Sequence, residues 1–203
     1  TEDLTGPVRL TSTERFACQV LVPGLEVFQR QHPGIEIEMI IDQRNLSLVR
    51  READIAVRLA RPAVGEVIAR RVGTMTHHFY AACSLRGTPL AALPLVSYDE
   101  ASLHTPEARH VIGRAWSPEL RFSTNNQAAR IAAACAGFGV ALLPKFVGES
   151  LAELERIDVG LPPLQREIWL LVHRDLNRVP RFRASYDFIA DTIRAARHQL
   201  VGD

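Results

Sequence analysis

The chain alternates short apolar runs with longer segments of helical periodicity, and this α/β pattern occurs twice, over residues 8–57 and 95–143. A strand–helix–strand order in which each helix separates two strands predicts parallel pairing through right-handed crossovers. Two such regions in 203 residues predict an α/β protein with two similar lobes. The chain should cross between the lobes near residues 74–80 and 171–178.

Periodicity and turn residues set the bounds of the expected elements. The run Ile35–Ile41 alternates isoleucine with glutamate, which predicts a strand at the edge of its sheet, since covered parallel strands are apolar on both faces. Pro23-Gly24 should kink or divide the first helix. We expect strands at residues 8–10, 35–41, 54–57, 67–75, 77–83, 95–98, 120–123, 139–143 and 167–173, helices at 14–30, 45–53, 125–136 and from Pro180 onward, and irregular structure at 99–118.

The bulk composition narrows the class of protein. The chain is 47% hydrophobic, which suffices for a sizeable core, and its net charge of +1 shows no basic excess of the kind that nucleic-acid binding requires. Its three cysteines are scattered among apolar residues, which argues against a disulfide framework and favours a cytoplasmic protein. The sequence has neither a signal-peptide pattern at its start nor an apolar run long enough to cross a membrane.

Polar residues follow the predicted strands, at the positions where ligands bind in open α/β sheets. Where the first strand meets the first helix, hydroxyl groups lie beside free backbone N–H groups, which suit an anion. The planar guanidinium of Arg58, after the third strand, can bind a carboxylate through two hydrogen bonds. The candidate ligand-binding residues are Thr11, Ser12, Thr13, Asp42, Arg58, Thr124 and Asn125.

Each candidate also has a structural explanation. Ser12 is expected to cap the helix that follows it, whether or not it binds a ligand. Asp42 would serve equally as a helix cap, and so would the residues at 124–125. Arg58 would equally form an ion pair with Asp42 or Asp54, which a ligand could displace.

The sequence offers little for catalysis or metal binding. His77 and His78 are adjacent, so on a strand they point to opposite faces and do not form a metal pair. Cys83 has no identifiable acid–base partner, and Gly137-Phe138-Gly139 follows a helix, not a strand, so it is not a nucleotide-binding fingerprint. We therefore predict a protein that is not an enzyme and holds no cofactor or metal.

Five segments together resemble the effector-binding domain of LysR-type transcriptional regulators. Residues 23–28 and 32–35 are similar to the family's L-P-x-L-x-x-F…H-P run, and residues 50–59 contain the family's Asp-Ile-Ala-Val-Arg segment. Residues 136–144 resemble A-G-x-G-I-A-L-L-P, and residues 169–175 resemble W-L-L-V-H-x-D. The resemblance is specific because these motifs occur in order at the family's spacing.

This resemblance implies two Rossmann-like lobes joined by crossover strands, as in type 2 periplasmic binding proteins. The expected lobes are residues 1–76 with 174–203 and residues 77–173. It also implies a small-molecule effector in the cleft between the lobes, and the arginine and hydroxyls favour an organic or aromatic acid. Members of the family use hydroxyl residues at the position of Thr11–Thr13. A solute-binding protein with the same architecture, or an enzyme built on it, remains an alternative.

The resemblance further implies a homodimer or homotetramer in which the first lobe of one subunit meets the second lobe of another. The expected contacts are the helix 14–31, the strand 35–41 and the helix 125–136. The family's winged helix-turn-helix would precede residue 1, and no pattern of that kind occurs in this sequence. We therefore expect DNA binding only through that missing domain.

Overall fold

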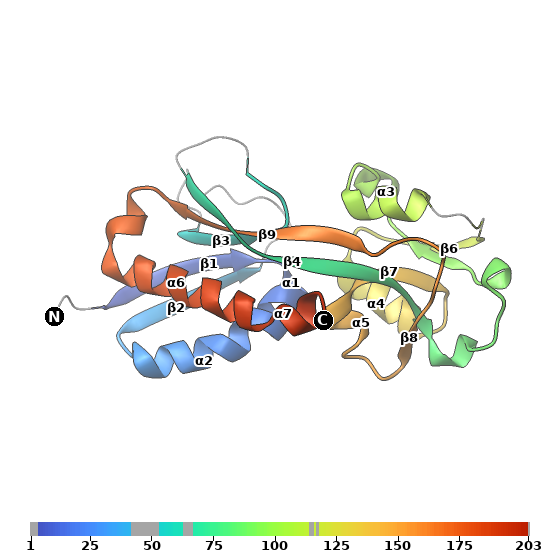
Figure 1. Ribbon diagram of the computed structural model, residues 1–203, viewed down its shortest axis with the longest axis horizontal. Coiled ribbons are helices and arrows are strands. Elements are labelled where there is room, and N and C mark those ends of the chain that lie inside the picture. The colour runs from blue at the N-terminus through green and yellow to red at the C-terminus, as the bar shows by residue number, and fades with distance from the viewer. Residues whose placement is uncertain (1–3, 42–52, 63–66, 114–115, 117, 203) are drawn as a thin grey trace. The chain divides into compact units, whose positions relative to one another are not determined.

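A computed structural model describes residues 4–41, 53–62, 67–113, 116 and 118–202. The chain divides into two compact units (Figure 1). The first comprises residues 1–74, 166–198 and 202–203, and the second comprises residues 75–165 and 199–201. Strands β4 (Val67–Ala82) and β9 (Leu164–His173) carry the chain between the units. The lobe limits expected from the sequence, 76/77 and 173/174, fall within β4 and directly after β9.

The sheet of the first unit has the strand order β2-β1-β3-β9-β4. Strand β1 (Gly6–Ser12) pairs in parallel with both β2 (Ile35–Ile41) and β3 (Ile55–Arg58), which confirms the expected crossover topology. Strand β9 runs antiparallel to β3. As its glutamates predicted, β2 lies at the edge of the sheet.

One long helical run and the C-terminal helix belong to the first unit. The run consists of α1 (Glu14–Phe16), a π-helical segment (Ala17–Leu21) and α2 (Val22–Gln31). The irregularity expected from Pro23 is this π-helical segment, which ends at Leu21, because proline has no N–H to donate to the preceding turn. Helix α2 packs on α6 (Pro180–Ala195), where the Phe28 and Phe188 ring centroids lie 4.9 Å apart.

The second unit is built on the C-terminal half of β4, in the strand order β4-β7-β5-β6. Strand β7 (Val140–Pro144) is antiparallel to β4 and parallel to β5 (Leu95–Ser97), and β6 (Leu120–Ser123) is parallel to β5. Strand β8 (Leu154–Arg156) pairs antiparallel with β4. Helix α4 (Gln127–Cys135) starts two residues later than expected.

The prediction of irregular structure over 99–118 was wrong, because α3 (Pro106–Ile112) lies within it. Thr105 caps this helix by accepting a hydrogen bond from the Ala108 amide at 3.2 Å, and Pro106 occupies the first turn. Buried Ala108 and Val111 anchor the helix on the core.

The remaining short elements are α5 (Lys145–Gly148), α7 (Arg197–Leu200) and the 3₁₀ turns η2 (Cys83–Leu85), η3 (Leu90–Ala92), η4 (Glu100–Ser102) and η5 (Leu176–Arg178).

Residues 42–52, on which two of the sequence expectations fall, are outside the described residues. The helix expected at 45–53 lies, apart from Ala53, outside the described residues, and so does Asp42.

Within the described part of the chain, no helix combines the length and the apolar character that a membrane span needs.

Candidate functional site

The polar residues of the first unit lie where its parallel strands end. The register pairs Ser12 with Ile41 and Thr11 with Ala56. Because parallel strands advance together, Arg58 ends β3 at the level of Thr13. The structure thus brings Thr13 and Arg58 to one edge of the sheet, as the sequence predicted.

The hydroxyl residues differ in exposure. Thr11 and Ser12 have relative exposures of 0% and 1%, whereas Thr13 is half-buried. The Thr11 Oγ1 atom is buried without a hydrogen-bond partner among the described residues. The prediction that Ser12 caps the first helix was wrong, because Thr13 occupies the cap position and makes no side-chain cap bond. Of the three, only Thr13 has a side chain with appreciable exposure.

Among the described residues, Asp54 pairs with Arg9 and not with Arg58, so the predicted alternative of an Arg58–Asp54 ion pair was wrong. Asp54 instead binds Arg9: its Oδ2 accepts from the Arg9 backbone amide at 2.8 Å, and its Oδ1 accepts from the guanidinium at 3.1 Å. Arg58 is half-buried and its Nη1 donates to the Val57 carbonyl at 3.1 Å. Asp54 therefore stabilises β1 against β3, and the alternative ion pair of Arg58 with Asp42 falls outside the described residues.

In the second unit, Thr124 and Asn125 lie between β6 and α4. The Thr124 amide donates to the Ser97 carbonyl at 3.2 Å, which joins the ends of β6 and β5. The helix cap, however, is Asn126, whose Oδ1 accepts from the Ala129 amide at 2.9 Å. The Thr124 hydroxyl accepts from the Asn126 amide at 3.1 Å, and Asn125 is exposed. Asn126 is therefore the residue that caps α4, and the expectation that a residue at 124–125 would cap it was wrong. Helix capping does not explain why Asn125 stands at its position.

Arg130 is a residue of this region that the sequence did not single out. It is 6% exposed, its guanidinium carbon lies 4.0 Å from the centroid of the Tyr98 ring, and its Nη1 donates to the Thr124 carbonyl at 3.1 Å. No acidic side chain of the described residues forms an ion pair with it. Arg130 therefore joins the segments that follow β5 and β6 through its charge and its planar shape. The sequence signal that could have pointed to Arg130 is its position as the one charged residue in the alanine-rich segment 127–135.

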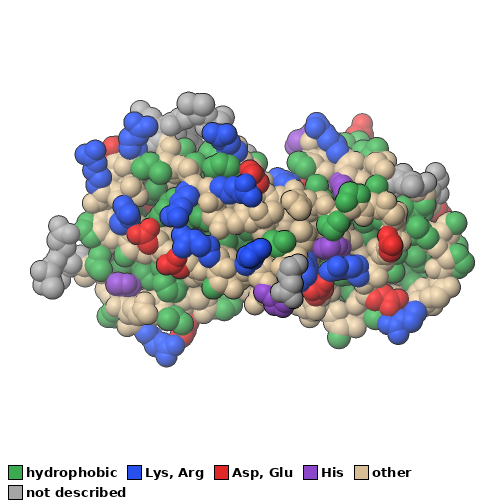
Figure 2. All heavy atoms as spheres, in the orientation of Figure 1, with side chains coloured by type: hydrophobic (Ala, Val, Ile, Leu, Met, Phe, Trp, Pro, Cys, Tyr) green, Lys and Arg blue, Asp and Glu red, His purple; other side chains and the backbone are tan. Residues whose placement is uncertain are grey.

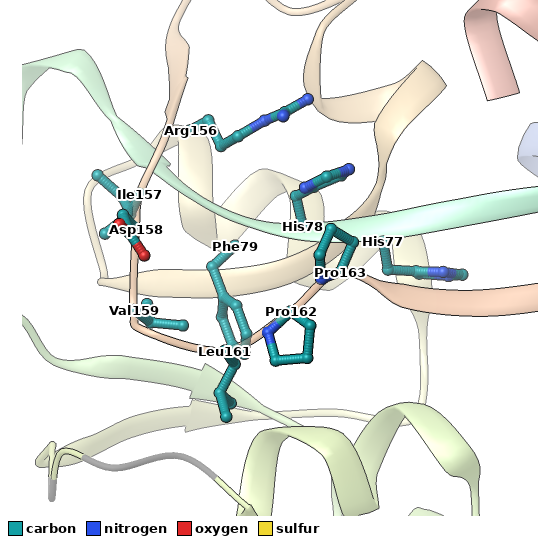
Figure 3. A pocket seen from close by; sticks show the side chains of 10 residues that line it. All are labelled: His77, His78, Phe79, Arg156, Ile157, Asp158, Val159, Leu161, Pro162 and Pro163. Atoms are coloured by element: carbon teal, nitrogen blue, oxygen red, sulfur yellow. The ribbon is translucent and has the colours of Figure 1, made fainter. Parts of the chain in front are cut away.

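The adjacent histidines do not form a metal site. His77 is buried and His78 half-buried on β4, and Figure 3 shows their rings pointing in different directions. No three histidine, cysteine or acidic side chains in the described ranges are grouped as metal ligands.

Basic side chains are not gathered into a nucleic-acid-binding stripe on the face shown in Figure 2, where acidic side chains lie among them. Ion pairs of the first unit include Arg71 with Glu167 at 3.2 Å and Arg183 with Asp187 at 2.9 Å. This face thus resembles an ordinary solvated protein surface.

Sequence comparison finds similarity to one family of bacterial regulators. The family model described as "LysR substrate binding domain" matches residues 1–194. The chain is 30% identical over 183 residues to the Mau operon transcriptional activator of Paracoccus denitrificans, which covers 90% of this chain and 64% of that protein. It is 26% identical over 179 residues to an uncharacterized HTH-type transcriptional regulator of Haemophilus influenzae, with coverages of 82% and 62%. The chain thus spans somewhat less than two thirds of these relatives.

Structural comparison shows the same fold in solved regulators. The regulatory domain of CrgA, a LysR-type transcriptional regulator from Neisseria meningitidis, has a TM-score of 0.77 and 17% identity, covering 92% of this chain and 98% of that one. Full-length AphB, the Vibrio cholerae virulence activator, has a TM-score of 0.71 and 18% identity, with coverages of 94% and 69%. These similarities confirm the expected two-lobed, periplasmic-binding-protein-like α/β fold.

Proposed function

Because this chain belongs to the LysR substrate-binding domain family, we propose that it acts as the effector-sensing regulatory domain of a bacterial LysR-type transcriptional regulator. The observation that carries this proposal is the family match over residues 1–194. The regulator's DNA-binding domain would lie in the rest of the full-length protein, and its site of action would be the cytoplasm.

The proposed effector is a small organic or aromatic acid that contacts residues of both units. In the first unit, Arg58 would bind the acidic group and Thr13 would supply a hydroxyl. Ser12 and Thr11 would join only after local opening, since both are buried. In the second unit, the Thr124 hydroxyl oxygen accepts a hydrogen bond from the Asn126 amide. That bond does not use the hydroxyl proton, so Thr124 can donate it to a ligand. Asn125 offers an exposed amide beside it.

The proposed mechanism is a shift in the population of arrangements of the two units. An effector that contacts both units can favour one arrangement only by binding it more tightly than the others. In an oligomer, that change would alter the spacing of the DNA-binding domains. The proposed oligomer uses the edge strand β2, the α1–α2 run and α4.

The proposal can be tested by a thermal-shift screen of organic acids, followed by calorimetry on the strongest hit. A hit at about 100 times its dissociation constant should add about 2.7 kcal/mol of stability. Arg58→Gln and Thr124→Val should each weaken binding by about tenfold or more, because each removes a hydrogen bond to the ligand. Arg183→Gln, an exposed arginine on α6, is the matched control and should bind as the wild type does.

Unchanged affinity in both site variants would refute the proposed site. A hit that is chemically converted during the measurement would instead favour an enzyme on this scaffold. Intact folding of each variant is checked by its far-ultraviolet circular dichroism and unfolding midpoint.

A further inference from the structure

A pocket of about 220 Å³ lies wholly within the second unit, between β4 and the connection from β8 to β9 (Figure 3). The Ile157 amide donates to the Phe79 carbonyl at 2.8 Å, and beyond this bond the connection diverges from β4. A turn in which Asp158 Oδ1 accepts from the Gly160 amide at 2.9 Å redirects the chain. None of the residues lining the pocket is among the candidate effector-binding residues.

A basic side chain and a histidine lie at one end of the pocket, Arg156 and His78. Lys145 and Arg156 share a single carboxylate: Lys145 Nζ lies 2.9 Å from Glu149 Oε2, and Arg156 Nη2 binds Glu149 Oε1. Arg156 lines the pocket together with His78 and so brings a guanidinium to this end of it. Burial, then Arg156 and Lys145, lower the pKa of His78 from 6.5, while Glu149 opposes this. The Tyr80 ring lies 6.5 Å from the His78 ring between centroids, and the other titratable residues that line the pocket are His77 and Asp158.

The protonation of His78 follows from its hydrogen bonds. The Thr76 hydroxyl donates its one proton to the Leu200 carbonyl at 3.3 Å. His78 Nε2, 3.1 Å from the Thr76 oxygen, must therefore be the donor of that contact. Neutral His78 then has its lone pair on Nδ1, and protonation adds a second donor, Nδ1–H.

The side chains at the other end of the pocket are mostly apolar, and Asp158 lies beside Val159 (Figure 3). Phe79 and Val159 are buried, Leu161 is half-buried, and Pro162 lies beside them (Figure 3). In the figure, Arg156 and His78 lie at the opposite end from Phe79 and Leu161. The cavity is smaller than those that hold drug-sized ligands, which excludes nucleotides and favours a compact guest.

We propose that this pocket is a second binding site, which takes a small monocarboxylate with an apolar body. The carboxylate would lie between the Arg156 guanidinium and His78, and the apolar body would contact Phe79, Val159 and Leu161. A charge-assisted hydrogen bond from Arg156 supplies affinity, and burial of the apolar body supplies preference over simple anions. This site is independent of the proposed effector site.

The test follows the His78 imidazole signals by NMR while benzoate is added, with benzamide as the neutral analogue and acetate as the analogue without an apolar body. Benzoate should shift the His78 signals saturably and raise the histidine's pKa, whereas benzamide and acetate should bind at least about tenfold more weakly. Benzoate affinity should rise as the pH falls through the pKa of His78, because protonated His78 donates to the carboxylate.

Three variants separate the contributions of the pocket. Arg156→Gln should weaken benzoate binding by about tenfold or more. Leu161→Trp should fill the apolar end and abolish binding while it leaves the charged end intact. His78→Gln should keep binding but remove its pH dependence. Arg121→Gln, an exposed arginine on β6 paired with Glu119, is the matched control and should bind benzoate normally.

The outcomes also separate this site from the effector site. Benzoate affinity that stays unchanged in both Arg156→Gln and Leu161→Trp, with each variant folded, would overturn the second site. So would benzoate shifts confined to residues near Arg58 or Thr124, although that result would support the proposed function. Conversely, binding that survives Arg58→Gln and is lost in Arg156→Gln establishes the second site whatever happens at the first.

Discussion

Arg9 and Asp54 bind each other through both backbone and side chain. The Arg9 amide donates to Asp54 Oδ2 at 2.8 Å, the Asp54 amide donates to the Arg9 carbonyl at 2.8 Å, and the guanidinium donates to Oδ1 at 3.1 Å. Asp54 is buried, so its carboxylate supplies a hydrogen-bond acceptor that water cannot replace. The contact fixes β1 beside the start of β3, which positions the strand ends where Thr13 and Arg58 lie.

Removing the Asp54 carboxylate should therefore cost more than removing the Arg9 side chain. We expect Asp54→Ala to lower the free energy of unfolding by about 2–3 kcal/mol, because it leaves the Arg9 amide unsatisfied. Arg9→Ala should cost under about 1 kcal/mol, since the backbone bonds remain and the guanidinium is partly exposed. Urea denaturation measures both. Equal losses in the two variants would show that the side-chain ion pair, and not the backbone contact, carries the stability.

Gly139, in the Ala-Gly-Phe-Gly-Val motif, is required by a close backbone approach. A Cβ atom there would lie 2.3 Å from the Pro94 carbonyl oxygen, and its φ of +152° also disfavours side chains. Gly139→Ala should lower the free energy of unfolding by about 2–4 kcal/mol. Gly87→Ala, at a φ of +84° with open space around it, should cost only about 1 kcal/mol. Comparable costs in urea denaturation would contradict the steric explanation.

Glu149 should make the stability of the second unit depend on acid pH. Burial, the largest single influence, raises its pKa, but hydrogen bonds and charges from Lys145 and Arg156 together bring the pKa below the ordinary 4.5. A carboxyl whose pKa is lower in the folded state stabilises the fold above its unfolded pKa and loses that contribution as pH falls through its folded pKa. The stability difference between wild type and Glu149→Gln should therefore be constant above about pH 5.5 and shrink below pH 4.5.

Urea denaturation from pH 3 to 7 measures this difference. The same comparison in a Lys145→Met background should show a weaker pH dependence, because one of the two cations is gone. A difference that grows as the pH falls would mean that burial outweighs the two cations.

Arg130 and Tyr98 should be energetically coupled. A cation–π contact of a buried guanidinium at 4.0 Å predicts a coupling free energy of about 1 kcal/mol in the cycle of Arg130→Met and Tyr98→Leu. The matched cycle uses exposed Arg61, which lies 5.6 Å from the Trp169 ring, and should give a coupling near zero. Additive effects at Arg130 and Tyr98 would show that they stabilise the fold separately.

The proposed oligomer surface can be tested at the edge strand. Ile41, at the end of β2, is 44% exposed, and we expect Ile41→Glu to weaken self-association by about tenfold or more, because it places a charge in the contact. Ile112→Glu, a similarly exposed isoleucine on α3 outside the proposed surface, is the control. Light scattering coupled to size exclusion measures the mass across a concentration series. A wild-type protein that stays monomeric at high concentration would refute the surface.

Local patterns predicted most of the strands and the strongest helices. The alternation in Ile35–Ile41 gave both the strand and its place at the sheet edge, and the Pro180 signal located the last long helix. Helix α3 was missed because its apolar content is low, although the Thr105-Pro106 start signal was present. The family motifs carried the fold class, since their order and spacing extend over nearly the whole chain.

The sequence by itself located the ends of the parallel strands β1 and β3 to within about two residues, because period and turn chemistry act over a few residues. Only the tertiary structure decided their partners. Asp54 meets Arg9, 45 positions away, and not Arg58, and Arg130 lies against Tyr98. Each of these choices depends on distances between segments remote in sequence, which sheet register and packing set and no local pattern encodes.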